Sequence, residues 1–197
     1  MVYDRTQTRP PLLTQSWWLG ARLYRTLGRF DAYRGVSSWA EAFHWLSTVH
    51  PGAEIGEIQY WGHGRWGNAR VDRDVLDITT LSRGHELQSV LQELRGRLAP
   101  ETLWWFRTCQ TFGAEAGHRF AQAWSEHLGA AVAGHTHVSW YWQSGLHRLA
   151  PGAAPRWSTS EGLRSGTPQS PEAALWSRPG RPNTITCLGG QVPEFAT

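Results

Sequence analysis

The chain has 197 residues, enough for one domain that buries about 70% of its unfolded surface. Hydrophobic residues make up 40% of the chain and charged residues 18%, a balance that excludes a disordered protein. The formal net charge is +3, and all 19 basic residues are arginine. Because no expected helix gathers these arginines on one face, the sequence argues against a nucleic-acid partner.

The start of the chain predicts four elements that are short or weakly patterned. We expect a loose arm over residues 1–13, which contains Arg9-Pro10-Pro11, then a short strand over 16–19. A helix over 21–27 and a weak strand over 30–33 follow. The apolar run at 17–19 is too short to span a bilayer, and the N-terminus lacks the pattern of a secretory signal. We therefore expect no membrane partner and a cytoplasmic location.

A stronger helix signal begins at Ser38. Glu41 stands three residues after Ser38, which is the spacing of a capping box. Trp39, Phe43 and Leu46 then repeat at helical spacing, so a helix is predicted to about residue 49.

The chain beyond residue 50 alternates strands and helices. The expected elements are a strand over 55–61, a helix over 86–98, a strand over 103–106, a helix over 114–128 ended by Gly129, a strand over 130–133 and a further strand within 135–142. Such alternation with short links predicts right-handed crossovers and a parallel sheet. The predicted fold class is α/β, a three-layer sandwich with a mainly parallel sheet. We assign residues 1–150 to this domain and residues 151–197 to an irregular Pro/Gly-rich tail that packs on it.

Two reactive side chains follow the ends of two of these strands. His63 comes just after the strand over 55–61, and Cys109 comes just after the strand over 103–106. The carboxyl ends of parallel strands meet at one edge of a sheet, where open α/β folds build their sites. A thiol and an imidazole at that edge predict a nucleophile and its general base. Only one other cysteine, Cys187, is present, too few for a disulfide scaffold.

The chemistry of a cysteine hydrolase sets further expectations. A helix that begins within about five residues of Cys109 is expected to lower the pKa of its thiol through the helix dipole. The backbone N–H of Gly64 is expected to help hold the oxyanion, and His63 to carry the proton to the leaving amine. Neither a metal nor a cofactor is needed for this reaction, and the expected partner is a peptide or protein substrate.

These motifs resemble the caspase-like cysteine peptidases, the group of caspases, legumain, clostripain, gingipains and separase. The stretch at 59–64 (Gln-Tyr-Trp-Gly-His-Gly) is similar to the family's apolar strand ending in His-Gly, and 103–109 is similar to its strand ending in the catalytic Cys. Residues 55–135 also resemble a caspase-like domain of large bacterial surface proteins. The resemblance implies a caspase-like fold and peptide-bond hydrolysis through a His63–Cys109 dyad and an acyl-thioester.

The resemblance also indicates a substrate pocket. In this family the residue two before the nucleophile often lines the pocket for the side chain preceding the scissile bond. That residue is Arg107 here, which suggests an acidic residue in the substrate; pairing of Arg107 with a neighbouring Asp or Glu is the equal alternative. His135 and Trp140 are expected to line the same edge of the sheet.

Three alternatives stay open at the level of sequence. The segment Gly134-His135-Thr136-His137 is similar to a terminal metal-ligand motif of calcineurin-like phosphoesterases, although the partner motifs of that family are missing. Tryptophans near the expected site, such as Trp66 and Trp142, could form a platform that binds a sugar. The chain could also be a catalytically inactive caspase-like interaction module, because a fold does not secure a function.

Overall fold

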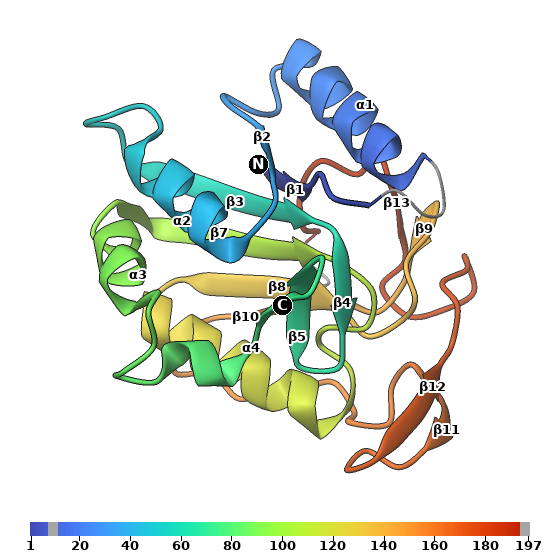
Figure 1. The fold of residues 1–197 in the computed structure, drawn as a ribbon. Helices are drawn as coiled ribbons and strands as arrows, with labels where there is room; N and C mark the ends of the chain where they lie inside the picture. Colours follow the sequence, from blue (N-terminus) through green and yellow to red (C-terminus); the bar gives the residue numbers. More distant parts are fainter. Residues whose placement is uncertain (8–11, 194–197) are drawn as a thin grey trace.

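A mixed six-stranded sheet forms the centre of the molecule in a computed structural model that describes residues 1–7 and 12–193 (Figure 1). Across the sheet its strands are β10 (Leu146–Leu149), β8 (Ala131–His135), β7 (Leu98–Arg107), β3 (Ile55–Trp61), β1 (Val2–Asp4) and β2 (Arg34–Val36). Every neighbouring pair is parallel except β10 with β8. The predicted α/β class with a mainly parallel sheet is therefore confirmed.

Four α-helices cover the two faces of this sheet unequally. They are α1 (Leu13–Thr26), α2 (Trp39–Thr48), α3 (Gln88–Arg95) and α4 (Ala114–Leu128). The helices α2, α3 and α4 share one core with the sheet, in which Trp104 of β7 lies 5.9 Å from both Phe43 and Trp124, measured between ring centroids. On the opposite face α1 packs Tyr24 against Trp61 of β3. The sheet is thus sandwiched, with a single helix on the second face.

The remaining elements are small. An antiparallel sheet of β4 (His63–Arg65), β5 (Asn68–Val71) and β6 (Asp74–Leu76) precedes a 3-10 helix, η1 (Ile78–Leu81). The strands β11 (Leu163–Gly166) and β12 (Pro171–Ala174) form a hairpin, and β9 (Trp142–Gln143) pairs with β13 (Ile185–Thr186). In the part of the chain that the structure describes, no helix combines the length and apolar character needed to cross a membrane.

The strongest patterns of the sequence are confirmed. The strand over 55–61 and the helix over 114–128 match β3 and α4. Ser38 caps α2 by accepting a hydrogen bond from the Glu41 N–H at 3.1 Å. Gly129 ends α4 with a φ of 65°, a left-handed conformation that favours glycine.

The helix predicted over 21–27 largely agrees with α1, whereas the other predictions for the start of the chain were wrong. Residues 2–4 form β1 between β2 and β3 instead of a loose arm, and residues 16–19 belong to α1. A strand of three residues is too short to show a period, so its contacts with two neighbouring strands decide its structure. The weak strand lies at 34–36 rather than 30–33. Arg9-Pro10-Pro11 lies outside the described residues.

The chain after residue 130 is more ordered than the sequence predicts. Of the expected strand within 135–142, His135 instead ends β8 and Trp142 begins β9, and β10 follows after a short turn. The described tail, residues 151–193, packs on the same sheet: Ile185 and Val192 lie against Trp105 of β7. This segment therefore covers the half of the second face that α1 leaves free.

Candidate functional site

The sheet register brings the strands that precede the two predicted catalytic residues to the same edge of the sheet. β3 and β7 are neighbouring parallel strands, and Trp61 pairs with Arg107 at their carboxyl ends. His63 and Cys109 each follow two residues later in the chain. Trp61 and Arg107 face α1. Both predicted residues lie beyond the ends of these strands, His63 in β4 and Cys109 in the bend after β7, so the alternation of side chains along β3 and β7 does not extend to them.

The loops that carry His63 and Cys109 are in direct contact. A Cβ placed on Gly64 would fall against the Thr111 hydroxyl and lie 2.8 Å from the Thr108 Cβ. The Gly67 N–H donates to the Thr111 carbonyl at 3.0 Å, and the Thr111 hydroxyl donates to the Asn68 carbonyl at 3.0 Å. Residues 63–65, expected in a glycine turn, instead form the strand β4. Close packing of the Thr108 and Thr111 side chains against this backbone explains why a residue without a side chain is needed at Gly64.

His63 lies in a partly buried, aromatic setting. Its ring meets the Trp17 ring of α1 edge-on, with 5.6 Å between centroids. Burial lowers the pKa of His63 from its ordinary value, and the charge of Asp4 partly opposes that shift. The imidazole is therefore neutral at pH 7, the protonation state that a general base requires.

Cys109 is partly buried, and its thiol lies 3.7 Å from the carbonyl oxygen of Ser139. Burial raises the pKa of the thiol above its ordinary value, opposite to the expected effect of a helix dipole. The helix α4 begins at Ala114, within the expected distance, but a tight turn at residues 110–113 lies between it and the thiol, and burial decides the direction of the shift. Within the described residues no hydrogen bond joins the His63 ring to the Cys109 thiol.

Arg107 does not present a charge to an open pocket. The side chain is buried, and its hydrogen bonds reach neutral oxygens only, those of Tyr24, Gln59, Gln143, Cys187 and Gly189. The guanidinium also stacks 4.3 Å from the centre of the Trp105 ring. Among the described residues no Asp or Glu forms a salt bridge with Arg107, so the alternative of a direct pair with a neighbouring acidic residue was wrong; Glu57 acts on it only through its charge. Arg107 instead binds the backbone of the tail.

The two remaining pocket predictions have different outcomes. His135 is fully buried: the Trp105 Nε1–H donates to its Nε2 at 3.3 Å, so its Nδ1–H donates to the Ser144 carbonyl at 3.3 Å. Its assignment to a substrate pocket was wrong, because β8 lies between two other strands and beneath the tail. Trp140 is 69% exposed, one residue beyond the Ser139 carbonyl that contacts the thiol. Trp140 therefore lies on the rim of the site.

The segment Gly134-His135-Thr136-His137 does not present two free imidazoles. Both ring nitrogens of His135 are occupied as described above. The His137 Nδ1 lies 2.9 Å from the Thr136 hydroxyl, which donates to Glu161 at 2.8 Å. Across residues 1–7 and 12–193, no group of three His, Cys, Asp or Glu side chains is arranged to hold a metal ion. Trp66 is buried, and Trp142 is partly buried in β9.

Asp4 is a site residue that sequence reasoning missed. It ends β1, the strand beside β3, and its carboxylate is fully buried. The carboxylate accepts hydrogen bonds from the Thr6 N–H at 2.8 Å and from the Asp72 N–H at 3.3 Å. The sequence contained a pattern that could have revealed Asp4. The apolar pair Val2-Tyr3 is followed directly by a charged residue, in the way that the apolar strands before His63 and Cys109 are followed by polar ones.

The fold and site define a mixed α/β sandwich with an imidazole, a thiol and a carboxylate at the carboxyl edge of adjacent strands. Comparisons with protein-family models, with curated proteins and with solved structures find no match to this chain.

Proposed function

We propose that this protein is a cysteine endopeptidase in which Cys109 is the nucleophile and His63 the general base. The observation that carries the proposal is the register of β3 and β7, in which Trp61 pairs with Arg107. His63 and Cys109 each follow two residues after a member of this pair in the sequence. The caspase-like resemblance of the sequence agrees with this arrangement, because that family also ends two strands in His-Gly and in the catalytic Cys.

The protonation states favour base-assisted attack over a preformed ion pair. Burial keeps the Cys109 thiol protonated and the His63 imidazole neutral at pH 7. His63 would take the thiol proton as Sγ attacks the carbonyl carbon of the scissile peptide bond. The C–N bond then breaks, the proton passes from His63 to the leaving amine, and an acyl-thioester remains on Cys109. Water, deprotonated by His63, hydrolyses the thioester and restores the thiol.

The oxyanion of this reaction would be held by backbone N–H groups where the two loops touch. Gly64 follows His63 and lies against Thr108 and Thr111, so its backbone N–H is held beside the loop of Cys109. The earlier expectation of an acidic residue before the scissile bond receives no support from Arg107, whose donors meet backbone and amide oxygens.

An inactive interaction module is the second candidate. The raised pKa of Cys109 favours it, because a buried protonated thiol is a poor nucleophile without an effective base. The two candidates differ in whether His63 activates Cys109.

Cleavage of a peptide library that presents every residue before the scissile bond tests the proposal. The wild-type protein is expected to cleave a subset of peptides, and Cys109→Ala and His63→Ala are expected to lose at least about a hundredfold in rate. The matched control is His44→Ala, which removes an exposed histidine of α2. Folded wild-type protein that cleaves nothing, or equal rates in His63→Ala and His44→Ala, would contradict the proposal.

A further inference from the structure

A segment of the chain lies at the site in the manner of a bound peptide. Residues 185–190 run beside β9, with β13 antiparallel to it: Ile185 pairs with Gln143 and Thr186 with Trp142. The Cys187 N–H continues this pairing by donating to the Tyr141 carbonyl at 2.9 Å. Addition of an extended strand to a sheet edge is a common way for proteins to bind peptides.

Side chains from the opposite side hold three consecutive carbonyl groups of this segment. The Arg107 guanidinium donates to the carbonyls of Cys187 at 2.7 Å and Gly189 at 3.0 Å. The Tyr24 hydroxyl donates to the Cys187 carbonyl at 2.7 Å, and Arg29 donates to the Leu188 carbonyl at 2.6 Å. These contacts recognise main-chain oxygens and do not read side chains.

The segment contacts the elements on either side of the proposed nucleophile. Arg107, whose guanidinium it covers, stands two residues before Cys109 at the end of β7. The Ser139 carbonyl that contacts the thiol belongs to the loop leading into β9, the strand with which the segment pairs. One peptide-like segment therefore lies between the strand before the nucleophile and the loop that touches its sulfur.

We propose that residues 185–190 occupy the place of an extended substrate peptide and restrict access to Cys109 until they leave. The inference rests on the proposed function and deepens it in two respects. The substrate is an extended peptide bound through its carbonyl oxygens, and Arg107 and Tyr24 are the residues that bind those oxygens. The first step of activity is then the departure of this segment.

The attachment of the segment is limited, which allows it to leave. The pairing strands β9 and β13 have two residues each, and isolated strand pairs of this size are marginal in water. Residues 185–190 are partly or largely exposed, and two of them are glycines. Arg29, which holds Leu188 and contacts Gly190, is itself an exposed side chain. Replacing Arg29 therefore loosens the segment without opening the core.

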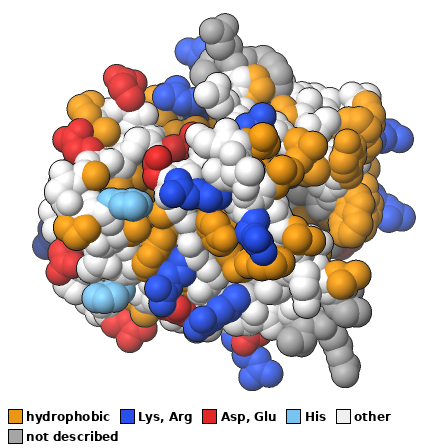
Figure 2. Space-filling view, turned by 90° about the horizontal axis from the view of Figure 1, so that it is seen from above, with side chains coloured by type: hydrophobic (Ala, Val, Ile, Leu, Met, Phe, Trp, Pro, Cys, Tyr) orange, Lys and Arg blue, Asp and Glu red, His pale blue; other side chains and the backbone are white. Residues whose placement is uncertain are grey.

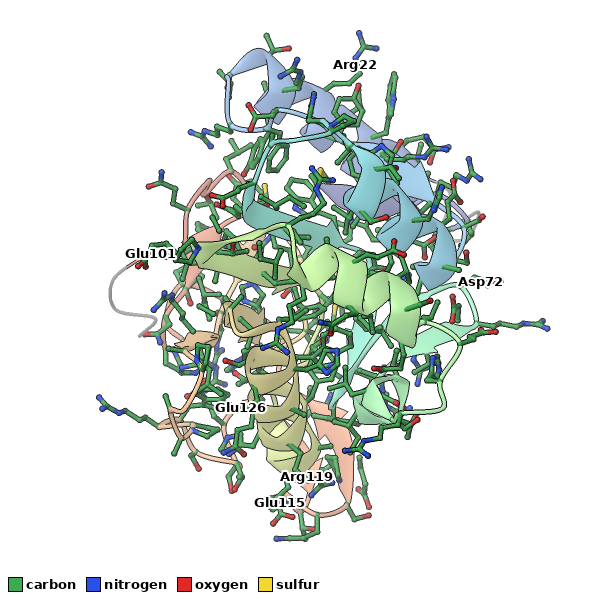
Figure 3. The ribbon with its side chains drawn as sticks, turned by 90° about the vertical axis from the view of Figure 1, so that its left-hand side faces the viewer. Arg22, Asp72, Glu101, Glu115, Arg119 and Glu126 are labelled. Carbon is green, nitrogen blue, oxygen red and sulfur yellow. The ribbon has the colours of Figure 1, made fainter. Side chains whose placement is uncertain are left out.

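The test is the rate at which a small thiol reagent, iodoacetamide, labels Cys109. A Cys187→Ser background leaves one cysteine, and the hydrogen bonds of Cys187 use only its backbone. In this background Arg29→Gln is expected to raise the labelling rate about fivefold, because one charge-assisted hydrogen bond to the segment is lost. The control is Arg22→Gln: Arg22 is an exposed arginine of α1 that points away from the body of the molecule (Figure 3) and stacks on Trp18.

A second variant and a peptide make the outcome decisive. Tyr24→Phe removes the hydroxyl that donates to the Cys187 carbonyl, and is expected to raise labelling in the same direction. A synthetic peptide Thr-Ile-Thr-Ser-Leu-Gly-Gly, with Ser in place of Cys187, is expected to slow labelling of Arg29→Gln. Equal labelling rates in Arg29→Gln, Tyr24→Phe and Arg22→Gln would overturn the inference. Faster labelling that depends on the segment but not on His63 would support this inference and contradict the proposed catalysis.

Discussion

The substitution Gly64→Ala tests the contact on which the proposed site depends. The added Cβ would fall against the Thr111 hydroxyl and lie 2.8 Å from both the Cβ and the hydroxyl of Thr108. The two threonine hydroxyls are hydrogen-bonded to each other at 2.5 Å, and both side chains are buried. Neither threonine can move aside without losing that bond. The methyl group therefore has to separate the loops that carry His63 and Cys109.

The size of the effect follows from two contributions. Overpacking of a buried site costs about 1–3 kcal/mol, and loss of one buried hydrogen bond costs about 1 kcal/mol. We expect the free energy of unfolding to fall by about 3 kcal/mol, and the melting temperature to fall by roughly 6–12 °C for a chain of this length. Urea unfolding followed by tryptophan fluorescence measures the first quantity.

The matched control is Gly56→Ala in β3, where a Cβ would have no atom within 4 Å. Its stability is expected to change by less than about 0.5 kcal/mol. The double variant Gly64→Ala/Thr111→Ala removes the clashing hydroxyl, so its loss is expected to be smaller than the sum of the two single losses. Equal stability of Gly64→Ala and Gly56→Ala would refute the reasoning that the loops meet at Gly64.

Three further predictions concern stability, each measured by urea unfolding. His135 has a pKa of about 3 in the folded chain against an ordinary 6.5, because its ring is buried. Its contribution to the free energy of unfolding is therefore complete above pH 6.5 and is lost as the pH falls, by about 2 kcal/mol from pH 7 to pH 5. His135→Gln is expected to lose less stability over this pH range. Ser38→Ala removes the cap of α2 and is expected to cost about 1 kcal/mol. Arg107→Lys cannot reach the carbonyls of both Cys187 and Gly189, and is expected to cost about 2 kcal/mol or more. A loss between pH 7 and pH 5 in His135→Gln equal to that of the wild type, or an unchanged free energy of unfolding in Ser38→Ala or Arg107→Lys, would contradict the corresponding argument.

The parts of the fold that the sequence predicted are those with long, regular patterns. The strand over 55–61 and the helix over 114–128 bury a consistent set of side chains, so their periodicity marks them without any tertiary information. The alternation of strands and helices predicted that the strands before His63 and Cys109 could be neighbours. It did not predict that these strands end at the same level, because register depends on contacts between strands that are distant in the chain.

The parts that the sequence did not predict depend on contacts between distant segments. β1 has only three residues, and it exists because β2 and β3 supply hydrogen bonds on both sides. Arg107 was assigned to a substrate pocket because it stands two residues before the proposed nucleophile, as in the family that the sequence resembles. The tail at residues 185–190 instead supplies carbonyl groups to it, and no local sequence pattern predicts that contact. His135 was expected at the open edge of the sheet, whereas the Trp105 indole and the Ser144 carbonyl enclose its ring.

One exposed feature remains outside this account of the site. The outer face of α1 carries partly exposed apolar side chains with arginines between them (Figure 2), among them Trp18, Leu19, Leu23 and Leu27. The same helix supplies Trp17 to His63 and Tyr24 to Arg107. α1 therefore joins this outer face to the residues of the site.

The most direct test of the account is the dependence of Cys109 reactivity on His63. The measurement is the second-order rate constant for iodoacetamide labelling of Cys109 at pH 7, in the Cys187→Ser/Arg29→Gln background, with His63 present and with His63→Ala. The account predicts a rate at least about tenfold lower without His63, because a buried protonated thiol then lacks its base. Equal rates in the two proteins would contradict the proposed pair.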